Sequence, residues 1–388
     1  MGRESRISSG ETAFAVDRKS ELGQFYTTNY DYILRGMSIP EGLPVIEPFV
    51  GNGDLARWCE SLGHKVREAY DISPPHDSYC RNIVVRDTLM SPPDYDGKFI
   101  VTNPPYLAAN KVKKRVVDGI EVKEETAFDK WQVSDLYKAF IRSFCSQNPS
   151  GGVIIVPLNF ICDAKDKSSR SEFLSKFSID KMNIFEEQVF DDTTYTVCSI
   201  QFSLRQEPVE RSSFNCFLYP GEERIGLSLS KEYGWQIAGD YFSKNQEHDY
   251  KVSRLLNAKG ASPLTKEARE KSLNPGKDNK ITNLMLHCVD GKHGKRESSI
   301  RMEWNPVPLF GKDTDRSFCT LVIEPALSQE KQRELMNDFN KELDRLREKY
   351  HSLFLVNFRE FGRKRVSFTI AFDIIRKCLK KKKGRENV

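Results

Sequence analysis

Four consecutive residues, Asn103-Pro104-Pro105-Tyr106, follow the apolar run 99–102 directly. If that run is a strand, the four residues lie at its carboxyl end, where ligands bind in a doubly wound α/β sheet. The Asn103 side-chain oxygen and the Pro104 carbonyl could accept both hydrogens of one NH2 group, because prolines fix φ and add carbonyls without competing N–H groups. An aromatic amine held in this way becomes a better nucleophile, and Tyr106 would stack on its ring.

A glycine-containing turn precedes this tetrapeptide in the chain. Glu47-Pro48-Phe49-Val50-Gly51-Asn52-Gly53-Asp54 follows the apolar pair Val45-Ile46 and precedes a helical pattern at 55–59. This order predicts a strand, a turn and a helix. Gly51 and Gly53 permit backbone conformations and a close ligand approach that side chains forbid. Because a lone G-x-G sequence is commonly a surface turn, its meaning depends on what surrounds it.

Two acidic residues follow the next two predicted strands. Asp71 comes after the strand at 65–70, and Asp87 comes after the strand at 82–85. An acid at the end of the second strand of such a fold binds ribose hydroxyls. Asp87 could accept a hydrogen bond from an adenine amine. A glycine turn, two acids and the tetrapeptide at successive strand ends therefore favour a cofactor that carries a nucleoside.

The surrounding sequence alternates short apolar runs with helical patterns up to about residue 204, which is typical of an α/β domain. The fully apolar run 152–156 predicts a strand buried on both faces of a parallel sheet. A helix is predicted over 135–144 and a late strand over 197–204. Beyond residue 220 the pattern predicts long loops at 257–300, a helix at 328–350, a strand at 352–358 and a final helix that carries 370–379.

Charge is distributed unevenly along the 388 residues. Residues 201–388 hold 36 Lys and Arg against 26 Asp and Glu, whereas residues 1–200 hold 24 against 29. A basic half beside an acidic half is consistent with a polyanion-binding part, although a solvated lysine-rich surface explains the charge equally well. The predicted division is a flexible arm at 1–20, a catalytic domain at 21–220 and a basic domain at 221–388.

Composition excludes several other classes of protein. The nine cysteines are scattered and form no C-x-x-C pair, which argues for a reducing, cytoplasmic compartment and against a disulfide framework or a zinc site. No metal is predicted. No apolar run is long enough to span a bilayer, and residues 1–6 lack the apolar stretch of a secretory signal.

At this point the sequence resembles the adenine-N6 DNA methyltransferases of restriction–modification systems. Glu47 to Asp54 is similar to the family's glycine loop, and Asn103 to Tyr106 is similar to its catalytic tetrapeptide. Gly23-Gln24-Phe25-Tyr26-Thr27 resembles the N-terminal cofactor motif, and Asp135 to Phe140 resembles the helix that follows the tetrapeptide. The order of the motifs is that of the subgroup in which the cofactor motif comes before the tetrapeptide and the target-recognition domain comes last. The resemblance covers about residues 21–204.

The resemblance implies a doubly wound, Rossmann-like α/β methyltransferase domain followed by an α+β target-recognition domain. It implies S-adenosylmethionine as the cofactor and direct methyl transfer to N6 of an adenine flipped out of duplex DNA. Phe190 and Tyr106 would sandwich the base, with Tyr195 as the alternative to Phe190. The implied catalytic residues are Asn103, Pro104, Pro105, Tyr106 and Phe190. The implied cofactor-binding residues are Phe25, Tyr26, Thr27, Glu47, Pro48, Gly51, Gly53, Asp71, Ile72, Asp87 and Asn103.

DNA contacts are predicted at two basic segments. Lysine and arginine side chains in such segments bind phosphates more often than base edges. The residues are Lys111, Lys113 and Lys114 in the loop after Tyr106, and Arg359, Arg363, Lys364 and Arg365 before the last helix. The expected partner is double-stranded DNA, with no membrane, and a cognate restriction endonuclease would act separately. A monomer or weak dimer is expected.

Other activities stay open on the sequence alone. An RNA adenine-N6 methyltransferase would carry the same tetrapeptide, and cytosine-N4 methylation is chemically almost the same reaction. Methylation of a protein glutamine also presents a planar amide NH2, but the basic domain at 221–388 disfavours it. An inactive nucleic-acid-binding protein that keeps the fold is the alternative from a different class. Pro-Cys, the dipeptide of a C5-cytosine enzyme, does not occur.

Overall fold

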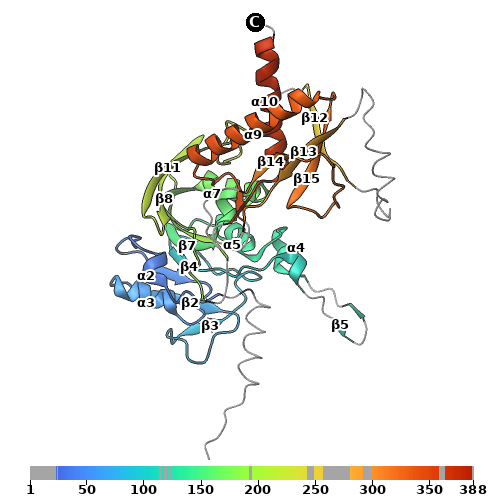
Figure 1. Cartoon of the computed structure of the whole chain (residues 1–388). Helices are drawn as coiled ribbons and strands as arrows, with labels where there is room; N and C mark the ends of the chain where they lie inside the picture. The colour runs from blue at the N-terminus through green and yellow to red at the C-terminus, as the bar shows by residue number, and fades with distance from the viewer. Residues whose placement is uncertain are drawn as a thin grey trace, which may run out of the picture. The chain divides into compact units, whose positions relative to one another are not determined.

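The computed structural model describes residues 23, 25–112, 116–117, 120–121, 125–191, 195–242, 249–256, 280–291, 299–357 and 363–386. The predicted arm at 1–20 lies outside these residues. The chain divides into two compact units (Figure 1). Unit 1 comprises residues 1–160 and 165–235, and unit 2 comprises residues 161–164 and 236–388.

Unit 1 is built on a nine-stranded sheet in the order β11-β10-β8-β9-β7-β4-β1-β2-β3. Its strands are β1 (Val45–Glu47), β2 (Val66–Asp71), β3 (Ile83–Val85), β4 (Phe99–Thr102), β7 (Gly151–Pro157), β8 (Phe177–Phe185), β9 (Val197–Leu204), β10 (Arg211–Tyr219) and β11 (Glu223–Ser230). The two-residue strands β5 (Val116–Val117) and β6 (Ile120–Glu121) form a separate hairpin. The helices are α2 (Tyr30–Ile33), α3 (Asp54–Ser61), α4 (Ala127–Trp131), α5 (Leu136–Cys145) and α7 (Lys167–Lys176), and α6 (Asn159–Cys162) lies where the units divide.

The central strands β1, β2, β3, β4 and β7 run parallel, as the buried apolar runs at 99–102 and 152–156 predicted. The chain passes from β1 through α3 to β2 in one direction along the sheet, and from β4 through α5 to β7 in the other. Right-handed crossovers in opposite directions place these helices on opposite faces, which makes the sheet doubly wound. The point where the direction reverses lies between β1 and β4, so their carboxyl ends flank the expected ligand site.

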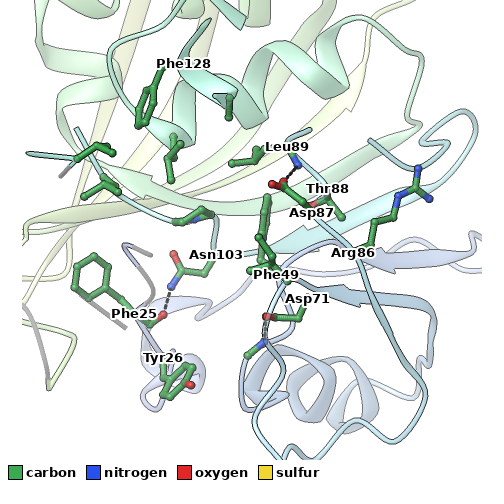
Figure 2. A pocket seen from close by; sticks show the side chains of 17 residues that line it. Phe25, Tyr26, Phe49, Asp71, Arg86, Asp87, Thr88, Leu89, Asn103 and Phe128 are labelled. Carbon is green, nitrogen blue, oxygen red and sulfur yellow. Dashed lines mark hydrogen bonds between the residues drawn. The ribbon is translucent and has the colours of Figure 1, made fainter. Parts of the chain in front are cut away.

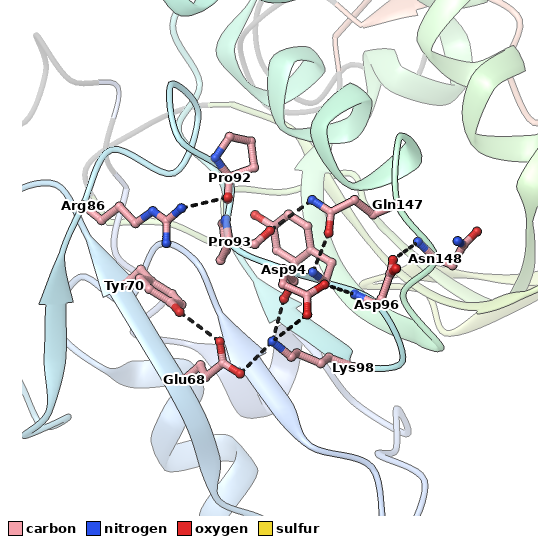
Figure 3. Close-up of polar contacts among 11 residues, drawn as sticks. Glu68, Tyr70, Arg86, Pro92, Pro93, Asp94, Asp96, Lys98, Gln147 and Asn148 are labelled. Carbon is pink, nitrogen blue, oxygen red and sulfur yellow. Dashed lines mark hydrogen bonds and ion pairs between the residues drawn. The ribbon is translucent and has the colours of Figure 1, made fainter.

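A polar network fixes the beginning of β4 (Figure 3). The Gln147 side chain, just after α5, accepts a hydrogen bond from the Tyr95 amide at 2.7 Å and donates one to the Pro93 carbonyl at 3.0 Å. The Lys98 ammonium pairs with Glu68 of β2 at 2.7 Å. These contacts hold the amino end of β4, and Asn103 follows its carboxyl end.

The domain boundary in the structure differs from the predicted one at 220/221. Strand β11 pairs antiparallel with β10 over eight residue pairs and continues the sheet of unit 1. The predicted boundary therefore falls inside a β-hairpin, and unit 1 extends to Trp235. The strands β8, β10 and β11 are not predicted from the sequence. In β11, however, Ile225, Leu227 and Leu229 alternate with exposed residues, as a half-buried strand requires.

Unit 2 has an α+β arrangement. An antiparallel sheet in the order β12-β15-β13-β14 packs against two long helices. Its elements are β12 (Lys251–Arg254), β13 (Ile281–His287), β14 (Arg301–Trp304), β15 (Phe318–Glu324), α9 (Gln329–Lys349), β16 (Val356–Asn357), β17 (Lys364–Arg365) and α10 (Phe368–Glu386). Leu284 and Leu286 are fully buried, as is Phe339 of α9, so the helices cover one face of this sheet.

Of the expectations for this half of the chain, the strand at 352–358 is wrong in extent, and the long loops expected within 257–300 lie mostly outside the described residues. Strand β13 occupies part of the segment expected to be long loops, because its buried residues Thr282, Leu284 and Leu286 alternate with half-buried ones. The strand expected at 352–358 is reduced to Val356–Asn357, since the preceding residues form a turn in which His351 and Ser352 have positive φ. Among the described residues, no helix has both the length and the apolar character needed to cross a bilayer.

Candidate active site

A cavity of about 210 Å³ lies at the carboxyl ends of β1, β2, β3 and β4 (Figure 2). Eight predicted site residues line it, namely Phe25, Tyr26, Gly51, Asp71, Ile72, Asp87, Asn103 and Pro105. The lining residues that the sequence analysis missed are Phe49, Arg86, Thr88, Leu89, Leu107, Val112, Ala127, Phe128 and Leu136. The cavity therefore joins the glycine turn, both acids and the tetrapeptide, which lie between residues 51 and 105 of the chain, at the switch point of the sheet.

The turn after β1 depends on its two glycines. Gly51 and Gly53 have φ values of 52° and 81°, a region that other residues rarely adopt. A Cβ atom on Gly53 would lie 2.8 Å from the Cys80 backbone nitrogen. The Gly51 N–H donates a hydrogen bond to Asp71 Oδ2 at 2.9 Å, which joins the turn to the end of β2.

The two acids are held by backbone donors. Asp71 is 3% exposed, and its other oxygen, Oδ1, accepts a hydrogen bond from the Ser73 amide at 2.7 Å. Asp87 Oδ1 accepts hydrogen bonds from the amides of Leu89 and Met90, both at 3.0 Å. Each carboxylate is thus fixed in orientation, while its remaining lone pairs are suited to hydroxyl or amine donors of a ligand.

Glu47 is a buried acid without a hydrogen-bond partner on one oxygen. It is 1% exposed, and no described residue bonds to its Oε2 atom. Burial, together with the nearby carboxyls of Asp54 and Asp71, raises the pKa of Glu47 well above its usual range. Glu47 itself does not line the cavity. The acceptors that line the cavity, the carboxylates of Asp71 and Asp87, fit a ligand that offers hydroxyl or amine hydrogens, as a nucleoside does.

The tetrapeptide is anchored through Asn103. The Asn103 side chain is nearly buried, and its Nδ2 donates to the Phe25 carbonyl at 2.8 Å and to Thr27 Oγ1 at 3.1 Å. The Tyr106 hydroxyl lies 2.5 Å from Asn103 Oδ1 and 2.8 Å from the Ile155 carbonyl. Burial raises the pKa of Tyr106 well above its usual range, so its hydroxyl remains a donor. The Pro104 carbonyl accepts no hydrogen bond from the residues that the structure describes.

The three aromatic residues predicted to contact the base differ in how far they are buried. Tyr106 and Phe190 are only 3% and 1% exposed, and neither lines the cavity. Tyr195 is half-buried, and its ring lies 6.1 Å from that of Tyr106 and 5.8 Å from that of Phe25. Stacking of a base on Tyr106 and Phe190 stays a prediction, and Tyr195 is the aromatic residue of this group with exposed surface.

The remaining predicted cofactor residues lie around the cavity. Thr27 is 4% exposed and contacts Asn103, while Gly53 precedes α3 at its N-cap. The Pro48 carbonyl accepts a hydrogen bond from the Thr88 hydroxyl at 3.1 Å. No group of three or more His, Cys, Asp or Glu side chains within the described part of the chain is arranged to hold a metal.

The predicted DNA-binding residues are only partly described. Lys113, Lys114 and Arg359 lie outside the described residues. Lys111 is exposed, and its Nζ lies 3.4 Å from the Tyr195 hydroxyl. In unit 2, Arg363 donates to the Asp290 carbonyl at 2.5 Å, and burial lowers the pKa of Arg365. Lys364 is 3% exposed, which argues against a phosphate contact for this side chain.

Residues 86–190 match the family model of the Eco57I restriction-modification methylase. This segment is therefore similar to part of a restriction–modification methylase. It contains Asp87, the tetrapeptide and the helix beginning at Leu136, so the resemblance to restriction–modification methyltransferases found in the sequence is confirmed there. S-adenosylmethionine is the cofactor that this methylase match supports. The carboxyls and glycine turn described above are the residues that would hold it.

Solved structures that match this chain include the M protein of the type I restriction enzyme EcoKI, at 14% identity over 54% of this chain and 51% of that one, with a TM-score of 0.36. A type I restriction-modification methyltransferase subunit from Streptococcus thermophilus matches at 12% identity over 53% of this chain and 50% of that one, with a TM-score of 0.33. The DrdV–DNA complex matches at 13% identity over 72% of this chain and 36% of that one, with a TM-score of 0.40.

The chain spans about half the length of the type I subunits that it matches. These distant likenesses assign no substrate and no residue role to it. No curated protein matches the sequence.

Proposed function

We propose that this protein is a restriction–modification methylase that transfers a methyl group from S-adenosylmethionine to N6 of an adenine flipped out of duplex DNA. The observation that carries the proposal is the shared cavity, which brings Asn103 of the tetrapeptide to Gly51, Asp71 and Asp87 at the switch point of the sheet. The methylase match over residues 86–190 supports the class of reaction. The choice of adenine rests on the tetrapeptide.

Within this proposal, Asn103 Oδ1 and the Pro104 carbonyl each accept one hydrogen from the amine of the base. Withdrawing both hydrogens from the ring plane localises the nitrogen lone pair, which is otherwise delocalised. Bound S-adenosylmethionine supplies an electrophilic methyl sulfonium. One N–C bond forms as the S–C bond breaks, and one amine hydrogen leaves as a proton, so no covalent enzyme intermediate is needed. Asn103 and Pro104 act only on the amine, by orienting it and polarising its N–H bonds.

The other predicted roles belong to the same proposal. Phe190, or Tyr195 in its place, and Tyr106 would contact the faces of the flipped base. Duplex DNA would be held by Lys111, Lys113 and Lys114 and by Arg359, Arg363 and Arg365, with unit 2 reading the sequence. The proposal also includes a cognate endonuclease that acts separately, a monomeric or weakly dimeric state and a cytoplasmic location.

The test is incubation of the protein with duplex DNA and labelled S-adenosylmethionine, followed by base-resolution mapping of the label. We expect methyl groups on adenine N6 within a short recurring sequence. Label on cytosine N4, or on RNA alone, would replace the proposal with one of those reactions. Asn103→Ala should lower turnover by at least about 100-fold, as loss of a transition-state hydrogen bond does, with nearly unchanged binding of DNA and cofactor. An active Asn103→Ala enzyme would contradict the mechanism.

A further inference from the structure

The Asn103 amide can serve as an acceptor in only one of its two orientations. A side-chain amide presents an oxygen on one side and an NH2 on the other, and the two have nearly the same shape. If the amide were flipped, the NH2 of Asn103 would face the NH2 of the substrate, and neither group could accept a hydrogen. The protein therefore needs contacts that select one orientation of this side chain.

Those contacts come from the segment Phe25–Thr27, 76 to 78 residues away in the chain. The Phe25 carbonyl can only accept, and it lies 2.8 Å from Asn103 Nδ2, the contact drawn in Figure 2. Thr27 Oγ1 takes the second amide hydrogen at 3.1 Å. Both hydrogens of Asn103 are thereby used. On the oxygen side, the Tyr106 hydroxyl uses one lone pair of Oδ1 and leaves the other available.

Water cannot easily replace the Thr27 contact. Thr27 is 4% exposed and Asn103 is 9% exposed, so an amide hydrogen that lost its partner would remain buried. A buried polar group without a partner is destabilised by far more than a solvated one. The position of the amide is thus coupled to one hydroxyl on the segment whose neighbours Phe25 and Tyr26 line the cavity.

We propose that Thr27 is a positioning residue, whose hydroxyl, together with the Phe25 carbonyl, holds both amide hydrogens of Asn103 so that the Asn103 oxygen stays available to the amine being methylated. This role differs from the contact with S-adenosylmethionine that the sequence predicts for Thr27. It rests on the proposed function, because it needs an amine substrate. A contact with the cofactor alone would change cofactor affinity, whereas a positioning role changes turnover.

Three variants separate these possibilities. Thr27→Val keeps the shape of the side chain and removes the hydroxyl, and Thr27→Ser restores it. Thr102→Val is the matched control, because Thr102 is fully buried next to Asn103 and its hydroxyl has no hydrogen-bond partner among the described residues. We expect Thr27→Val to lower kcat by about 10- to 100-fold with little change in KM for S-adenosylmethionine. Thr27→Ser should recover most of the loss, and Thr102→Val should match the wild type.

A second measurement reads the amide directly, without activity. In protein labelled with ¹⁵N-asparagine, the Asn103 side-chain resonances are assigned by their absence in Asn103→Ala. Both amide hydrogens should exchange slowly in the wild type and in Thr27→Ser, and one should exchange faster in Thr27→Val.

A raised KM for S-adenosylmethionine at unchanged kcat would overturn the proposal, and so would unchanged exchange in Thr27→Val. If the wild type methylates no adenine, the proposed function fails. The exchange measurement then still confirms or overturns the Thr27 contact.

Discussion

The buried carboxyl of Asp135 should make the stability of unit 1 fall as the pH rises from about 4 to about 6. Burial raises the pKa of Asp135 from 3.8 to about 6, against the opposing effect of the Lys138 ammonium. Its Oδ1 atom is buried without a hydrogen-bond partner among the described residues. The folded state therefore keeps a proton that the unfolded chain has already lost in this pH range.

The size of the effect follows from the two pKa values. Below pH 4 both states are protonated, and the group contributes nothing. Above pH 6 both are ionised, and the folded state bears the full cost of a buried charge. The values differ by about 2, which corresponds to a free energy of unfolding lower by about 2–3 kcal/mol at pH 7 than at pH 4. Asp135→Asn removes this term because an amide does not ionise.

The assay is urea denaturation of the wild type and Asp135→Asn at several pH values. It is followed by tryptophan fluorescence, because three of the four tryptophans, Trp58, Trp131 and Trp235, lie in unit 1. The difference in unfolding free energy between the two proteins at one pH cancels the contribution of the other titrating groups. The hydrogen bonds that the amide loses shift this difference by a constant, so they do not affect how it changes with pH. The variant should gain about 2–3 kcal/mol on the wild type between pH 4 and pH 7. A difference that stays constant with pH would refute the reasoning.

Three further substitutions test separate parts of the fold. Gly53→Ala should destabilise unit 1 by about 1–3 kcal/mol and weaken S-adenosylmethionine binding, because the φ of Gly53 is 81° and the added Cβ would meet the Cys80 nitrogen. Denaturation measures the loss of stability, and calorimetric titration measures the loss of affinity. Gln147→Ala should cost about 1–3 kcal/mol in the same denaturation assay, yet leave cofactor affinity unchanged, because its two hydrogen bonds hold the far end of β4. Phe339→Ala, at a fully buried position of α9, should destabilise unit 2 by about 3–5 kcal/mol, seen as an earlier loss of its helical circular dichroism; an unchanged midpoint would contradict the assigned core.

The parallel core of unit 1 could be predicted from the sequence, because its strands leave short, uninterrupted apolar signals. The run 99–102 is buried at every position, and so is 151–157. The glycine turn follows β1, the two acids stand at the ends of β2 and β3, and the tetrapeptide follows β4. Because these strands are parallel, all of these residues are expected at the same edge of the sheet. The cavity lined by Gly51, Asp71, Asp87 and Asn103 is the arrangement that this order implies.

The sequence was less informative where contacts join distant segments. Phe128 and Val112 line the cavity only because the chain between β4 and α5 returns to it, and no local pattern encodes that return. The hydrogen bonds from Asn103 to Phe25 and Thr27 depend equally on tertiary placement. In β11 buried residues alternate with exposed ones, which is a strand pattern, but only three of its residues are apolar and the signal is weak. In unit 2 the buried positions alternate with partly exposed polar ones, which made β13 look like a loop.

Among the residues that the structure describes, strand β3 forms one edge of the large sheet and carries two exposed valines, Val84 at 54% and Val85 at 69%. Such an edge offers unpaired backbone groups to a strand from another molecule. Two features oppose self-association by this route. The strand has only three residues, and arginines at 81 and 86 flank it, so identical edges that approach each other bring like charges together.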